Sequence, residues 1–88
     1  MQMNETRKDR ILVVDDEKPI REVLAASLAD EGYLVETAEN GEMGLKLIES
    51  FQPSVVLLDI WMPGKYDGIG VLKIARDKFP DVDFIVMS

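Results

Sequence analysis

The chain has 88 residues, of which 47% are apolar, a formal charge of -7, and neither cysteine nor histidine. This length allows one small domain, and the apolar content is sufficient for a core. The composition excludes disulfides and the usual zinc ligands, and the negative charge argues against nucleic-acid binding by this segment.

The N-terminal residues predict neither a membrane segment nor a folded element. No apolar stretch approaches the roughly 18 residues of a membrane span. Residues 1–9 are polar and lack the apolar part of a signal peptide. We therefore predict a cytoplasmic protein without a membrane partner, with a flexible lead-in over residues 1–9 and one domain over residues 10–88.

The first strand and helix follow this lead-in. Residues 10–14 (RILVV) form a short β-branched run that predicts a strand, and residues 19–31 have the three-four apolar spacing of a helix. We expect its apolar positions, including Ile20 and Val23, to face a core. Gly32 can end the helix, because glycine adopts the left-handed conformation without strain.

The second strand and helix are predicted from alternation and capping. Residues 33–38 (YLVETA) alternate well enough for a half-exposed strand at the sheet edge. Asn40 is a candidate N-cap for a helix over residues 41–50, which carries Gly44 and Ile48 on its apolar face.

The remaining elements repeat this order. Residues 55–58 (VVLL) predict a strand buried on both faces, which runs into a single carboxylate at Asp59. A helix over residues 67–79 and a strand over residues 83–88 (DFIVMS) follow. The helix positions that we expect to be buried are Ile69, Leu72, Ile74 or Ala75, and Phe79.

The alternation of strands and helices predicts an α/β fold with a mainly parallel sheet. If the first and third strands are neighbours, their carboxyl ends bring Asp15, Asp16 and Asp59 to one rim, with Ser88 at the end of the next strand. Three adjacent carboxylates repel one another, so they favour a divalent cation. We predict Mg²⁺, because it takes oxygen ligands and retains waters for a phosphoryl group.

This rim predicts phosphoryl chemistry. Once a cation offsets its charge, Asp59 can act as a nucleophile toward phosphorus, and Ser88 can hydrogen-bond a phosphoryl oxygen. Each residue also has a structural interpretation, since acids after a strand often meet water or begin a helix. Their conjunction at one rim favours the chemical interpretation.

Four segments together resemble the receiver domain of bacterial two-component response regulators. They are ILVVDDE (11–17), VVLLDIWMPG (55–64), Asp67 with Gly68, and FIVMS (84–88). The resemblance implies a flavodoxin-like, doubly wound parallel sheet, here with four strands in the order 2-1-3-4 and three helices. It also implies a sensor histidine kinase as the phosphoryl donor.

The resemblance further implies a role for each site residue. Asp59 would be the phosphoacceptor and Ser88 the switch hydroxyl. Mg²⁺ would be held by Asp16 and Asp59 directly, by Asp15 directly or through water, and by the backbone carbonyl of Trp61. Such a module is a phosphoacceptor switch rather than an enzyme, because it assists only its own phosphotransfer and dephosphorylation.

The chain departs from the family pattern in two places. The loop MPGKYDG is one residue longer than usual between its Met-Pro and Asp-Gly pairs, a feature that, with DIW, resembles NtrC/NtrX-type regulators. The fifth strand and the last two helices of the family fold are missing after residue 88. We therefore expect a truncated receiver with impaired phosphotransfer, which self-associates through the uncovered edge of the fourth strand.

Two other functions remain as alternatives. A pseudo-receiver or interaction scaffold that is not phosphorylated fits the truncation but does not explain the intact acids. A phosphohydrolase of the haloacid-dehalogenase type would need a second acid two residues after the nucleophile, and Trp61 occupies that position.

Overall fold

A computed structural model describes residues 10–62 and 68–87, in which four strands alternate with three helices. All neighbouring strands pair in parallel in the order β2-β1-β3-β4, so the predicted fold class and strand order are confirmed. The predicted lead-in over residues 1–9 and the predicted switch residue Ser88 lie outside the described residues. The elements are β1 (Arg10–Val14), α1 (Lys18–Asp30), β2 (Leu34–Ala38), α2 (Gly41–Phe51), β3 (Val55–Asp59), α3 (Gly68–Lys78) and β4 (Asp83–Met87).

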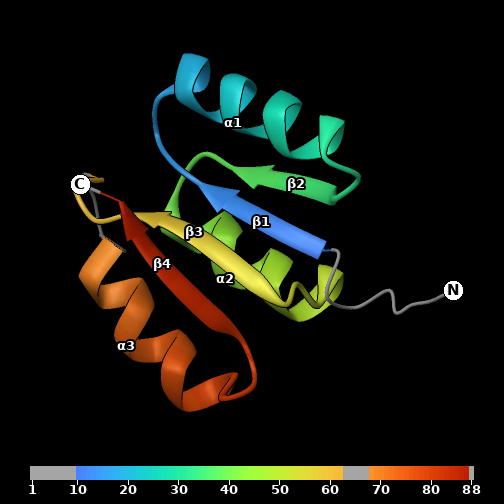
Figure 1. Ribbon diagram of the computed structural model, residues 1–88. Helices are drawn as coiled ribbons and strands as arrows, with labels where there is room; N and C mark the ends of the chain where they lie inside the picture. The colour runs from blue at the N-terminus through green and yellow to red at the C-terminus, as the bar shows by residue number, and fades with distance from the viewer. Residues whose placement is uncertain (1–9, 63–67, 88) are drawn as a thin grey trace, which may run out of the picture.

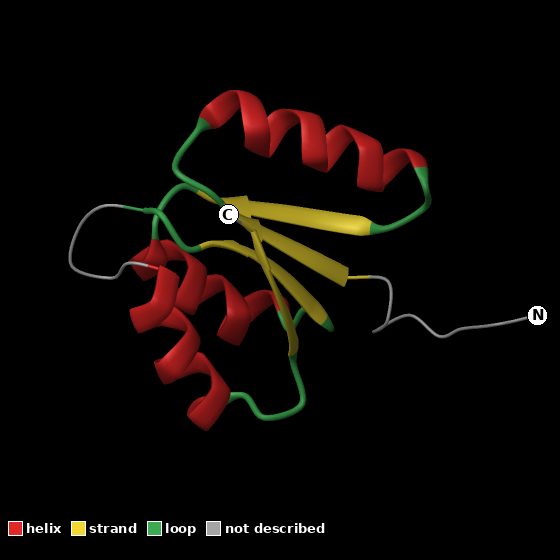
Figure 2. Ribbon diagram, turned by 60° about the vertical axis from the view of Figure 1, so that its left-hand side comes forward, coloured by secondary structure: helices red, strands yellow, loops and turns green. Residues whose placement is uncertain are grey.

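Helices cover the two faces of the sheet unequally. α1 lies alone on one face, and α2 and α3 lie together on the other (Figure 1, Figure 2). α1 makes its main contacts with β1 and β2, whereas α2 contacts β1, β2 and α3. The sheet therefore has one face with two helices and one face with a single helix placed over its β2 side.

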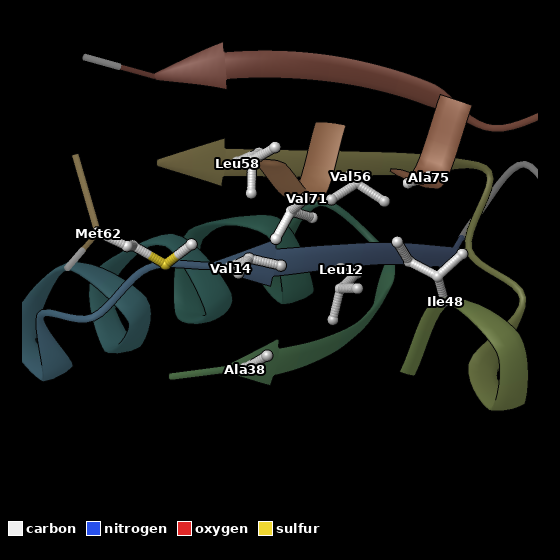
Figure 3. Close-up of a cluster of buried hydrophobic side chains, with 9 residues drawn as sticks. All are labelled: Leu12, Val14, Ala38, Ile48, Val56, Leu58, Met62, Val71 and Ala75. Carbon is white, nitrogen blue, oxygen red and sulfur yellow. The ribbon is translucent and has the colours of Figure 1, made fainter. Parts of the chain in front are cut away.

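The core lies between the sheet and the pair α2 and α3. Alternate residues of β1 and β3 point toward these helices, as the period of two in a strand requires. Asn40 caps α2 as predicted, because its Oδ1 accepts a hydrogen bond of 2.8 Å from the backbone N–H of Met43. The core residues, shown in Figure 3, are Leu12, Val14, Ala38, Ile48, Val56, Leu58, Met62, Val71 and Ala75.

The opposite face of the sheet is less well covered. Val55 and Leu57 are only half-buried, and Ile85 of β4 is 54% exposed. The prediction that β3 is buried on both faces is therefore confirmed toward α2 and α3 and wrong toward α1. The reason is the position of α1, whose main contacts are with β1 and β2.

The predicted apolar faces of two helices need correction. Ile20 and Val23 of α1 are 41% and 64% exposed, and no residue of this helix is fully buried. In α3, Ile69 is exposed, and the fully buried apolar side chains are Val71 and Ala75. A short helix with many apolar residues allows more than one apolar stripe, and packing against the sheet selects among them.

Candidate functional site

Three carboxylates gather at the carboxyl ends of β1 and β3. Val14 and Leu58 are aligned across these strands, so the residues that follow them, Asp15 and Asp59, are neighbours. Asp16 lies in the turn between β1 and α1. One oxygen from each carboxylate lies within 4.8 Å of the other two. The structure thus brings these three acids together, as the sequence predicts.

Asp15 is the most enclosed of the three acids, with only 5% of its surface exposed. Burial raises the pKa of its carboxyl above the ordinary value of 3.8, and a hydrogen bond of 2.9 Å from the backbone N–H of Glu17 to Oδ1 opposes this shift. The charges of Asp59 and Asp16 raise the pKa further. The raised pKa of Asp15 is therefore due in part to repulsion among the three acids. A bound cation would relieve this repulsion.

Asp59 is half-buried at the end of β3. Its Oδ1 accepts a hydrogen bond of 2.9 Å from the backbone N–H of Trp61. In the part of the chain that the structure describes, Oδ2 of Asp59, Oδ2 of Asp15 and both carboxylate oxygens of Asp16 accept no hydrogen bond. Each acid therefore retains at least one oxygen for a ligand.

This set of oxygen atoms could hold a metal ion. Mg²⁺ prefers hard oxygen ligands at about 2.1 Å and keeps several of its waters, so three carboxylates on one side are sufficient. The donor set and the excess of negative charge among the three acids both suit a divalent cation.

Two further predicted site residues are less well defined. Trp61 lies two residues after Asp59, and its side chain is 73% exposed. The metal-binding role of its backbone carbonyl stays a prediction. Ser88 is outside the described residues, but β4 ends at Met87, which is aligned with Asp59 of β3.

Two residues that contact the site were assigned no such contact from the sequence, although one of them, Gly68, belongs to the Asp-Gly pair that supports the family resemblance. Arg21 Nη1 donates a hydrogen bond of 2.8 Å to the backbone carbonyl of Asp15. Gly68 begins α3, and a Cβ atom at this position would collide with the backbone of Asp59 and Ile60. The available signals were an arginine on the first turns after the acid pair and the Asp-Gly pair itself.

A hollow of about 480 Å³ lies at the opposite end of the sheet, near the C-terminal ends of α2 and α3. Its lining includes Gln52, Ser54 and Lys78, and none of the three clustered acids. Carboxyl ends of parallel strands are the usual place for ligands in such sheets. The acid cluster is therefore the better candidate site.

Comparison with known sequences identifies the family. The response regulator receiver domain matches residues 11–88. An NtrX-like response regulator of Rickettsia typhi is 42% identical over 79 residues, which cover 89% of this chain and 17% of that protein. The ycf27 transcriptional regulator of Guillardia theta is 46% identical over 81 residues, which cover 92% of this chain and 31% of that protein. The chain thus spans less than a third of the length of these relatives. The predicted resemblance to NtrX-type regulators is confirmed, and the chain is also similar to ycf27 regulators.

Solved structures agree with this assignment. The response regulator TrrA from Thermotoga maritima, in complex with Mg(2+)-BeF, has a TM-score of 0.83 and 49% identity, covering 89% of this chain and 67% of its own. The receiver domain of NtrX from Brucella abortus has a TM-score of 0.82 and 38% identity, covering 86% and 64%. Among the described residues, no helix is long and apolar enough to cross a membrane, and the cytoplasmic location stays a prediction. On sequence and fold together, this protein belongs to the receiver domains of two-component response regulators.

Proposed function

We propose that this chain accepts a phosphoryl group on Asp59 from the phosphohistidine of a sensor histidine kinase. The observation that carries the proposal is the carboxylate of Asp59, which ends β3 beside two further acids and keeps one oxygen without a hydrogen bond to any described residue. Membership of the receiver family supports the same role. The chain would act as a regulatory switch rather than as an enzyme on separate substrates.

The geometry at Asp59 suits nucleophilic attack on phosphorus. The N–H of Trp61 holds Oδ1 and thereby orients the carboxylate. A carboxylate oxygen forms the new bond to phosphorus as the P–N bond of the phosphohistidine breaks, and the electron pair of that bond returns to the imidazole nitrogen. Ser88, which follows the end of β4, would hydrogen-bond a phosphoryl oxygen.

Mg²⁺ fits the donor set of this rim. Asp15, Asp16 and Asp59 would hold it, together with the backbone carbonyl of Trp61. A bound Mg²⁺ supplies positive charge beside the oxygens of the transferred phosphoryl group. The complex of TrrA with Mg(2+)-BeF supports a similar site here.

Trp61 provides the test, because it is the only tryptophan in the chain and its backbone contacts Asp59. Addition of Mg²⁺ and then of beryllofluoride, a phosphoryl mimic, should change its fluorescence at each step. Asp59→Asn should abolish the second response. Asp83→Asn, which alters an exposed acid at the start of β4, should retain both.

The same experiment can contradict the proposal. No response of the wild-type protein to beryllofluoride, with no binding in calorimetry, would exclude phosphoacceptance at Asp59. The family fold would then serve as an interaction scaffold that is not phosphorylated.

We also propose a second copy of this chain as a partner at the edge of β4. Among the described residues, β4 pairs only with β3, so its other edge carries unpaired backbone groups. Ile85 and Val86 are 54% and 44% exposed. Antiparallel pairing of two β4 strands about Ile85 would place Asp83 opposite Met87 and would avoid opposing like charges. The receiver domain of NtrC4 is a dimer in its beryllofluoride-activated form.

Sedimentation velocity over a range of concentrations tests this second partner. Ile85→Lys should shift the protein toward monomer, because it places a charge on the exposed edge strand. Ile69→Lys is a matched control, since Ile69 is 53% exposed on α3. A wild-type protein that is monomeric at every concentration would contradict the proposal.

A further inference from the structure

Among the residues that the structure describes, Asp15 forms three hydrogen bonds, each at a different one of its atoms. Its backbone N–H donates to the carbonyl of Ala38 at 3.1 Å, its Oδ1 accepts from the N–H of Glu17 at 2.9 Å, and its carbonyl oxygen accepts from Arg21 Nη1 at 2.8 Å. The first two bonds use backbone groups of Ala38 and Glu17. Only the third depends on the side chain of another residue.

The guanidinium of Arg21 has no described partner other than the carbonyl of Asp15. It is half-buried on α1, where its own backbone N–H donates to the carbonyl of Glu17 at 3.1 Å. Within the described ranges, its guanidinium forms no salt bridge. The side chain of Arg21 therefore joins the helix to the last residue before the turn that carries Asp16.

The charge and the position of Arg21 have opposite consequences for cation binding. Its positive charge would repel Mg²⁺ from the neighbouring acids. Its hydrogen bond limits movement of the turn over residues 15–17, which presents Asp15 and Asp16 beside Asp59. Groups that orient metal ligands from outside the coordination shell strengthen metal binding.

We infer that Arg21 is a positioning residue for the cation site, and that its bond to the Asp15 carbonyl contributes more to Mg²⁺ affinity than its charge removes. This inference rests on the proposed function, because it requires that the three acids bind Mg²⁺. Arg21 itself contacts neither the cation nor the phosphoryl group in this arrangement.

The test is a Mg²⁺ titration of Arg21→Met, followed by Trp61 fluorescence and by calorimetry. This variant removes the charge and the hydrogen-bond donors but retains a long side chain. We expect its Kd for Mg²⁺ to rise about tenfold, the scale seen when groups that orient metal ligands are removed. The difference should persist at high salt, because salt screens charge effects but not a direct hydrogen bond.

Lys18→Met is the matched control. It removes the same charge from the exposed surface of the same helix, where Lys18 lies 4.0 Å from Glu22. Its Kd for Mg²⁺ should be unchanged or slightly lower than that of the wild type. Thermal unfolding without Mg²⁺ would check that each variant is folded, and Arg21→Gln replaces Arg21→Met if the latter is not.

Three outcomes would overturn the inference. One is an Arg21→Met or Arg21→Gln variant that binds Mg²⁺ as tightly as the wild type or more tightly. Another is an equal rise in the Kd for Mg²⁺ in Arg21→Met and Lys18→Met, which would show that the bond to the Asp15 carbonyl has no specific effect on affinity. A wild-type protein that does not bind Mg²⁺ would overturn the proposed cation site as well, so the two failures are distinguishable.

Discussion

The two faces of the sheet differ in packing although their residues are chemically alike. On β3, Val56 and Leu58 point toward α2 and α3 and are fully buried, whereas Val55 and Leu57 point toward the α1 face and are half-buried. All four are branched apolar side chains, so the difference arises from the helices above them. An apolar run therefore predicts a strand inside the sheet without predicting how well each face is covered.

The largest expected loss of stability comes from shortening a leucine on the buried side of β3, compared with its neighbour on the other side. Leu58→Ala should lower the free energy of unfolding by about 3 kcal/mol, because it leaves a cavity in a closed core. Leu57→Ala should cost about 1 kcal/mol, because its side chain is already partly in water. Urea denaturation of both variants measures the difference. Equal losses would show that the two faces are equally well packed.

The next effect compares two glycines on the α2 and α3 side. Gly68→Ala should cost about 2 kcal/mol, because its Cβ would collide with the backbone of Asp59 and Ile60. It should also weaken Mg²⁺ binding, since that backbone carries the carboxylate of Asp59. In Gly44→Ala the atoms nearest to the new Cβ belong to the Val14 side chain, the closest being a methyl group at 3.1 Å, which can shift.

The Gly44 variant is therefore the control in the same denaturation and Mg²⁺ titrations. The strain in Gly44→Ala is offset by the better helix propensity of alanine, so its net change should be under about 1 kcal/mol. A Gly68→Ala variant as stable as Gly44→Ala would contradict the close approach of α3 to β3.

Loss of the N-cap residue should lower stability by a smaller amount, and by different amounts for α2 on one face of the sheet and α1 on the other. Asn40→Ala should cost about 1 kcal/mol, because the Met43 N–H at the start of α2 loses its acceptor. Glu17 occupies the corresponding position of α1 but makes no side-chain capping bond. Glu17→Ala should therefore change the unfolding free energy by less than about 0.5 kcal/mol. Thermal unfolding at neutral pH compares the two, and a larger loss in Glu17→Ala would reverse the ranking.

The smallest expected effect on stability comes from the acid cluster, where the substitution should raise stability instead of lowering it. The raised pKa of Asp15 means that the folded state binds a proton more tightly than the unfolded state. The contribution of Asp15 to stability therefore decreases as pH rises from 3.8 through the raised pKa. Asp15→Asn should raise Tm by a few degrees at neutral pH without Mg²⁺, and this gain should disappear below pH 3.8.

At saturating Mg²⁺ the wild type should instead have the higher Tm, because it binds the cation with a carboxylate that the Asp15→Asn variant lacks. Asp83→Asn is the control, since Asp83 is exposed and remote from the cluster. An Asp15→Asn protein that is less stable than the wild type without Mg²⁺ would contradict the repulsion among the three acids.

Local sequence patterns predicted the elements and the acids for specific physical reasons. The runs at residues 10–14 and 55–58 are too short for helices and rich in branched side chains, so their strand identity is a local property. The cap at Asn40 is equally local, because donor and acceptor lie three residues apart. The three acids follow from chain order, since parallel strands end at the same rim.

Other features depend on residues that are distant in the chain. The exposure of Ile20 and Ile69 follows from where α1 and α3 pack, which the helix period alone does not specify. The close approach of Gly68 depends on where the chain returns after β3. The pattern of charges likewise does not reveal that Arg21 bonds to a backbone carbonyl.

Hydrophobic periodicity and chain order were thus sufficient to predict the strands, the helices and the gathering of three acids at one rim. Only the tertiary structure decided how well helices cover each face of the sheet and how deeply Asp15 is buried. It also decided that Arg21 donates a hydrogen bond to the carbonyl of Asp15. These features depend on the register of β1 with β3 and on the placement of α1 and α3, and therefore on contacts between parts of the chain that are far apart in sequence.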